Sequence, residues 1–137
     1  MAINPLKVLF VASEVEGLVK TGGLADVAKA LPQHLARAGH DVRIILPFYQ
    51  TLKRRDEARL LASRWLPTPQ GRDDISYRIY QLELDGICVY LLDCPAYFER
   101  PQLYAENNQA YPDNGERFAF LAAAALHACE QLGFAPD

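Results

Sequence analysis

The sequence predicts an α/β domain: a Rossmann-like parallel sheet with flanking helices and a β-hairpin. Two strands and the helix between them carry this prediction, at residues 7–12, 24–38 and 41–46. A strand, a helix and a second strand in close succession form a βαβ unit, in which the strands are parallel and the crossover is right-handed. The hairpin is indicated by Asp85-Gly86 between β-forming runs at residues 75–84 and 87–92, since this dipeptide favours a tight two-residue turn.

The spacing of apolar residues predicts the first elements. Residues 7–12 are almost continuously apolar, which is typical of a strand buried on both faces. The helix is indicated by apolar residues at intervals of three and four: Leu24, Val27, Ala28, Leu31, Leu35 and Ala38. Gly39 suits the left-handed position after a helix, and Pro32 is expected to kink the helix.

A short helical stretch is expected at residues 51–57, a strand at 59–65 and a turn at 68–74. The last helix is expected to begin at Asp113 or Asn114 and to end at Gly133, and Asp113 with Glu116 resembles a capping box. Its buried face is predicted to contain Phe118, Leu121, Ala125, Leu126, Cys129 and Leu132. An α/β chain normally continues from such a helix into another strand, so we expect the sequence to be part of a longer domain.

Composition limits the class of protein. The chain has 137 residues and a net charge of −3, which fits one domain and gives no electrostatic reason to expect nucleic acid or an anionic membrane as a partner. The early apolar run is too short for a membrane span or a signal peptide. Three cysteines (Cys88, Cys94 and Cys129) without CxxC spacing favour reduced thiols in a cytoplasmic protein. The scattered histidines predict no metal site, and no catalytic Ser-His-Asp set is present.

The motif Lys20-Thr21-Gly22-Gly23-Leu24-Ala25-Asp26 carries the functional prediction. It follows the first strand and opens the first helix, where free backbone N–H groups and the helix dipole attract anions. Glycines let a ligand approach the backbone, and Lys20 adds a positive charge. The motif therefore predicts a site for a phosphate-bearing substrate. The alternative is that Gly22 and Gly23 only allow the helix to pack closely on the sheet.

Two other groups of residues could contact a sugar. Glu14 and Asp26 lie near the same strand end and could accept hydrogen bonds from hydroxyls, although Asp26 could equally stabilise the helix dipole. The long polar segment at residues 93–113 is of a length that usually binds something or covers a site. Three of its aromatic residues could stack on sugar rings or cap a cleft: Tyr97, Tyr104 and Tyr111. Alternatively they could pin the segment to the surface, which we expect for at least two of them.

These residues resemble the amino terminus of bacterial glycogen synthases and plant starch synthases. The resemblance is carried by KVLFVASE at residues 7–14, KTGGLADV at 20–27, ALP at 30–32, GHDVR at 39–43, YFERP at 97–101 and YPDN at 111–114. It implies a part of the amino-terminal domain of a two-domain GT-B glycosyltransferase, with the carboxyl-terminal nucleotide-binding domain outside these 137 residues. The family transfers glucose with retention from ADP-glucose to the non-reducing end of an α-1,4-glucan, and needs no cofactor or metal.

The resemblance also implies roles for particular residues. Lys20, Gly22, Gly23 and Asp26 would contact ADP-glucose, and Glu14 and Tyr104 would lie near the sugar or the acceptor glucan. The chain alone is expected to be inactive, because transfer needs both domains, and a cut domain is expected to self-associate. Alternatives are another GT-B enzyme with a different nucleotide sugar, such as sucrose synthase, and a non-catalytic glucan-binding domain. A nicotinamide-dependent oxidoreductase is disfavoured because G-x-G-x-x-G is absent.

Overall fold

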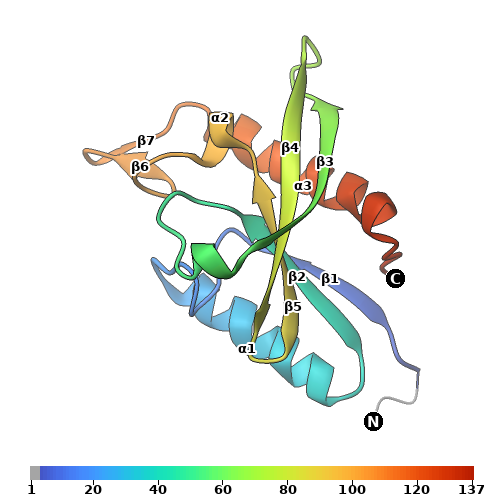
Figure 1. The fold of residues 1–137 in the computed structure, drawn as a ribbon. Helices are drawn as coiled ribbons and strands as arrows, with labels where there is room; N and C mark the ends of the chain where they lie inside the picture. Colours follow the sequence, from blue (N-terminus) through green and yellow to red (C-terminus); the bar gives the residue numbers. More distant parts are fainter. Residues whose placement is uncertain (1–3) are drawn as a thin grey trace.

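The computed structural model of the protein describes residues 4–137 and contains one five-stranded sheet (Figure 1). The strand order is β1-β2-β5-β4-β3, with β1 at Lys7–Val11, β2 at Asp41–Pro47, β3 at Arg59–Pro67, β4 at Asp74–Leu84 and β5 at Ile87–Asp93. β1, β2 and β5 are parallel neighbours, whereas β4 runs antiparallel to both of its neighbours, β5 and β3. The α/β prediction is confirmed, but the sheet is mixed because a tight turn at Asp85-Gly86 can join only antiparallel strands.

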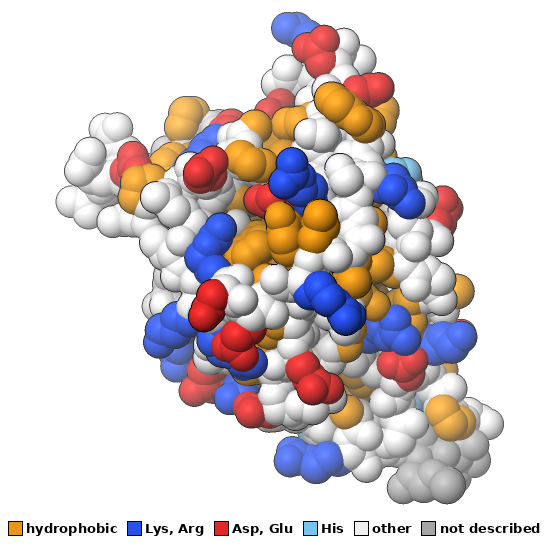
Figure 2. Space-filling view, in the orientation of Figure 1, with side chains coloured by type: hydrophobic (Ala, Val, Ile, Leu, Met, Phe, Trp, Pro, Cys, Tyr) orange, Lys and Arg blue, Asp and Glu red, His pale blue; other side chains and the backbone are white. Residues whose placement is uncertain are grey.

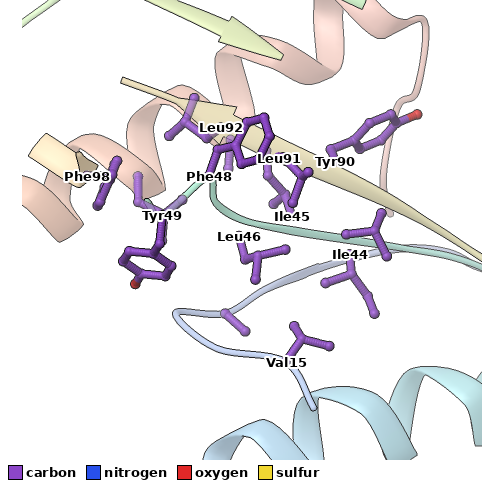
Figure 3. Packing of buried hydrophobic residues seen from close by; sticks show 14 of the residues in the cluster. Val15, Ile44, Ile45, Leu46, Phe48, Tyr49, Tyr90, Leu91, Leu92 and Phe98 are labelled. Carbon is purple, nitrogen blue, oxygen red and sulfur yellow. The ribbon is translucent and has the colours of Figure 1, made fainter. Parts of the chain in front are cut away.

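Two long helices cover opposite faces of this sheet: α1 at Gly23–Arg37 and α3 at Asn114–Leu132. Figure 3 shows the sheet between them, with Ile44 and Leu46 directed toward α1 and Val15 lying between the sheet and this helix. The remaining elements are short: η1 at Arg55–Glu57, α2 at Pro95–Phe98, β6 at Ala105–Glu106 and β7 at Gln109–Ala110. The helical stretch predicted at residues 51–57 is therefore reduced to the single turn of η1.

Helix α1 presents small side chains to the sheet. Ala25, Ala28 and Pro32 are buried, and α1 is unbroken at Pro32. The larger apolar residues that predicted the helix are outside this contact, since Leu24, Val27 and Leu31 are 42–52% exposed. Small side chains let the helix axis approach the sheet, so the periodicity located the helix but not the side that packs.

Two predictions about α3 are wrong. Leu126 is 66% exposed, while Phe120, which is absent from the predicted buried face, is fully buried. The carboxylate of Asp113 makes no capping hydrogen bond to the helix. It accepts two hydrogen bonds of 2.6 Å from the guanidinium of Arg100 instead, so this N-cap residue fastens the preceding segment and not the first turn of the helix.

A buried arginine on α3 organises residues 95–114. The guanidinium of Arg117 is wholly buried and donates hydrogen bonds to the carbonyl oxygens of Tyr97 at 2.6 Å and Leu103 at 2.8 Å, and to Asn114 Oδ1 at 2.8 Å. The rings of Phe98, Tyr111 and Phe118 surround it. Since Tyr97 is buried and the Tyr111 ring packs against the buried Arg117, the prediction that at least two of the three tyrosines pin this segment is confirmed.

Candidate functional site

The predicted site lies in the connection from β1 to α1, at the carboxyl ends of the parallel strands. Its first part is fixed by backbone hydrogen bonds. Val15 and Val19 form an isolated bridge, with an N–H···O distance of 3.0 Å, and the Lys53 N–H donates to the Leu18 carbonyl at 2.9 Å. Val15 and Leu18 are fully buried, so they anchor the connection and leave the turn at residues 20–23 to solvent.

The two glycines of this turn are not required by the packing. A Cβ atom added to Gly22 or Gly23 would meet no other atom within 4 Å. The φ angle of Gly22 is −165°, an extended conformation open to every residue. Close packing of helix and sheet therefore does not explain the glycines. What they provide is open space above the first amides of α1, where no preceding turn can accept their hydrogen bonds.

The buried side chain of Glu14 fixes the turn by hydrogen bonds. The residue is only 3% exposed. Its carboxylate accepts hydrogen bonds from four donors: Thr21 N–H at 2.8 Å, Thr21 Oγ1 at 2.6 Å, Gly22 N–H at 3.1 Å and Tyr104 OH at 2.5 Å. The N–H of Gly22 is thus directed at Glu14, and the amides left for a ligand are those of Gly23 and Leu24.

The hydrogen bonds fix the charge states of this network. Burial raises the pKa of Glu14, but the bonds from Thr21, Tyr104 and the backbone outweigh it, so the pKa is lowered and the carboxylate stays charged. Burial first, and then the bond to Glu14, raise the pKa of Tyr104 to about 12. Tyr104 therefore remains a donor at neutral pH, and its oxygen also lies 2.7 Å from Ser13 Oγ. This contact joins the long segment to the glycine turn.

Lys20 and Asp26 pair with each other across the mouth of the turn. The Lys20 ammonium lies 2.7 Å from Asp26 Oδ1, and the two side chains are 47% and 49% exposed. The hydrogen bond to Asp26 raises the pKa of Lys20, which keeps the ammonium charged. Because the pair is open to solvent, the lysine can exchange this partner for an incoming anion at little electrostatic cost.

Two hollows adjoin the turn, and Tyr104 lines both. The first, of about 500 Å³, is bordered by Lys20, Thr21, Lys53 and Gln102. The second, of about 570 Å³, lies between the end of β1 and the amino termini of α1 and α3, with Leu24 and Asn114 in its wall. Both volumes are within the range of ligand pockets. Two helix amino termini at one hollow favour a negatively charged ligand.

The structure brings together five of the six predicted residues on one short connection, and Tyr104 reaches them from a distant segment. Whether they touch a substrate stays a prediction. Sequence reasoning missed Thr21, Ser13 and Arg117, which position Glu14 and Tyr104. Arg117 had a detectable signal, because it is a charged residue on the apolar side of α3. Thr21 and Ser13 had none beyond their place in the motif.

Within residues 4–137, no group of three or more His, Cys, Asp or Glu side chains could hold a metal ion. Across the same range, no helix has both the length and the apolar character that crossing a membrane demands.

Replacing Glu14 with glutamine is expected to destabilise the protein by about 1–3 kcal/mol at neutral pH, because hydrogen bonds to a charged acceptor are lost. Since folding lowers the pKa of Glu14, its contribution is present above its ordinary value of 4.5 and is lost as the pH falls through the folded value. Urea unfolding at pH 7 and at about pH 3, well below 4.5, should show the parent approaching Glu14→Gln in acid. Glu16→Gln, at an exposed position, is the control. An equal stability gap at both pH values would contradict this role.

A lysine and an open glycine turn at a helix amino terminus, on the carboxyl edge of parallel strands, define an α/β domain suited to phosphate-bearing ligands. The sequence comparison is more specific. Residues 7–137 match the family described as the starch synthase catalytic domain. The chain belongs to this family, and the resemblance seen in the sequence is confirmed.

The chain is similar to several curated glycogen synthases. The chain is 82% identical to that of Aeromonas hydrophila over all 137 residues, and 58% identical to that of Photobacterium profundum over 134 residues, or 98% of the chain. It spans 28% and 26% of the length of these relatives. Among solved structures, the catalytic domain of starch synthase IV from Arabidopsis thaliana, bound to ADP and acarbose, matches with a TM-score of 0.83 and 30% identity, over 98% of this chain and 27% of that one.

Proposed function

We propose that the full-length protein transfers glucose with retention from ADP-glucose to the non-reducing end of an α-1,4-glucan, in the cytoplasm. The observation that carries the proposal is the glycine turn: two glycines that neither packing nor backbone conformation requires, beside a charged lysine at a helix amino terminus. Relatives named glycogen synthase, at up to 82% identity, and a structural neighbour that binds ADP support it.

The chemistry of the transfer explains the residues. The bond from glucose C1 to the diphosphate oxygen breaks, and C1 joins the 4-oxygen of the acceptor, whose hydroxyl proton is released. Negative charge then grows on the departing ADP. In our proposal Lys20 leaves Asp26 for the diphosphate, and the amides of Gly23 and Leu24 donate to its oxygens. Donors fixed in advance stabilise such charge without having to reorganise.

In our proposal, Glu14 and Tyr104 lie near the sugar of the donor or near the acceptor glucan. In the structure both are occupied with each other and with the turn, so their first effect is to keep Thr21 and Gly22 in place. The Tyr104 ring also lines both hollows and can form a wall against the sugar or the acceptor glucan. Asp26 would hold Lys20 when no donor is bound.

The test is glucosyl transfer by the full-length protein, with glycogen as acceptor and radiolabelled donors. We expect incorporation from ADP-glucose, much less from UDP-glucose, and a product that an α-1,4-specific amylase degrades. The anomeric outcome follows from that digestion. Binding of glycogen without incorporation from any nucleotide sugar would favour the non-catalytic glucan-binding alternative. Efficient use of UDP-glucose alone would favour another GT-B glycosyltransferase.

A further inference from the structure

The β3–β4 hairpin has an open face that the proposed reaction does not use. Trp65, the only tryptophan in the chain, is 66% exposed on the edge strand β3. Its cross-strand partner is Ser76, and the next pair on the same face is Ser63 with Arg78. All four residues are exposed. We call these four residues the hairpin face.

The other side of the hairpin is already occupied. Side chains alternate along a strand, so Arg64 and Tyr77 point away from the hairpin face. They contact α3, where Arg64 Nε donates to Gln131 Oε1 at 2.6 Å and the Tyr77 hydroxyl lies 2.6 Å from His127 Nδ1. In Figure 1, α3 passes behind the hairpin. The exposure of Trp65 is therefore set by the fold, because its strand neighbours fasten the opposite side.

A polar hollow continues the hairpin face toward the end of β5. Arg78 lies opposite Asp93 in the register of β4 and β5. Asp93 lines a hollow of about 240 Å³ together with Gln50, Glu99, Arg55 and Phe48. The Arg55 guanidinium lies 4.1 Å from the centre of the Phe48 ring. Two strand spacings across and two residues along place Trp65 about 12 Å from Asp93. Figure 2 looks onto this side and shows apolar and basic side chains next to one another over the hairpin.

We propose that an α-glucan chain binds across the hairpin face and this hollow, with a sugar ring stacked on Trp65. The inference rests on the proposed function, in that the substrate is a polymer far longer than the reacting end. An exposed flat indole offers an apolar face to the C–H groups of a pyranose. Carboxylate, amide, guanidinium and hydroxyl groups beside it accept from and donate to sugar hydroxyls.

A second copy of the chain fits this surface less well. Edge strands that pair between molecules are long, flat and apolar. β3 carries a bulge between Leu60 and Ala62 and ends at Pro67, and these features hinder pairing along the edge. Three of the four residues of the hairpin face are polar, whereas a face that docks on a protein usually has an apolar centre.

Retention of the full-length protein in native gels containing glycogen tests the inference. We expect Trp65→Ala to weaken the apparent affinity for glycogen about two- to tenfold, because one aromatic contact contributes about that much to binding. Trp65→Tyr should keep most of the affinity of the parent. Leu126→Ala is the matched control, since Leu126 is equally exposed, at 66%, and should not change retention. Asp93→Asn should weaken binding independently of the ring.

Equal retention of Trp65→Ala and the parent would overturn the inference. A change in oligomeric state on size exclusion without a change in retention would overturn it in favour of a protein interface. The gels contain no nucleotide sugar, so they test glucan binding alone. Transfer to maltotriose should be unchanged in Trp65→Ala, because this acceptor has no long chain beyond the reacting end to bind the hairpin face. If the parent itself fails to transfer glucose, the proposed function fails, whatever the gels show.

Discussion

Replacing Lys20 with alanine should lower kcat/KM for ADP-glucose by about 100- to 1000-fold in the full-length protein, the size of effect seen when one fixed donor to developing negative charge is removed. The loss should appear in kcat as well as in KM, because the charge on ADP is greatest as the glucosyl bond breaks. Stability should hardly change, since the side chain is half exposed and its pair with Asp26 lies in solvent.

Lys29 provides a matched control for this experiment. It is also a lysine of the α1 region in an ion pair, 3.1 Å from Asp85, but it lies away from the glycine turn. Lys29→Ala should leave kcat/KM within about twofold of the parent. Asp26→Asn should leave Lys20 charged and remove the opposite charge that holds it, so donor affinity should be retained or improved. Equal losses of kcat/KM in Lys20→Ala and Lys29→Ala would contradict a specific contact between Lys20 and the diphosphate. They would show instead that activity depends on the overall positive charge near α1.

Replacing Gly23 with alanine should weaken the binding of ADP without lowering the stability of the protein. A Cβ atom there meets nothing in the protein, and alanine is favoured over glycine in a helix by about 0.5–1 kcal/mol. The variant should therefore be as stable as the parent or slightly more stable. The added methyl group would enter the space assigned to the diphosphate, and crowding of this kind costs about 1–3 kcal/mol. Affinity for ADP should fall about tenfold to a hundredfold.

Gly115 provides a control for the effect of replacing glycine with alanine in the first turn of a helix. It also lies in the first turn of a long helix, and a Cβ atom added there meets nothing within 4 Å. Gly115→Ala should leave ADP affinity unchanged. Calorimetric titration with ADP and thermal unfolding of the same samples give both quantities. If Gly23→Ala bound ADP as tightly as the parent, the open space at the turn would not be a ligand site.

Much of the fold could be predicted because each element has its own local signal. Asp85-Gly86 located the β4–β5 hairpin, and the apolar runs located β1 and β2. The packing side of α1 could not be predicted from the size of its apolar residues. Contact between a helix and a sheet depends on how closely the backbones approach, and here Ala25 and Ala28 provide that approach. Leu24 and Val27 dominate the periodicity but lie outside the contact.

The site was predictable as a motif but not as a network. Lys20 and the two glycines stand together in the sequence, so their chemistry could be inferred directly. The position of Glu14 depends on Tyr104, which is 90 residues away, and the position of Tyr104 depends in turn on the buried Arg117. Such contacts form only when the segment at residues 93–113 folds over the carboxyl edge of the sheet, and no local pattern encodes this.

In our proposal, the turn between β1 and α1 holds the diphosphate of the sugar donor. A crystal structure of the full-length protein with ADP bound tests it most directly. We expect diphosphate oxygens about 2.7–3.2 Å from Lys20 Nζ and from the Gly23 backbone nitrogen, with the hydrogen bonds from Thr21 to Glu14 unchanged. A diphosphate bound elsewhere, with the glycine turn empty and Lys20 still paired with Asp26, would contradict it.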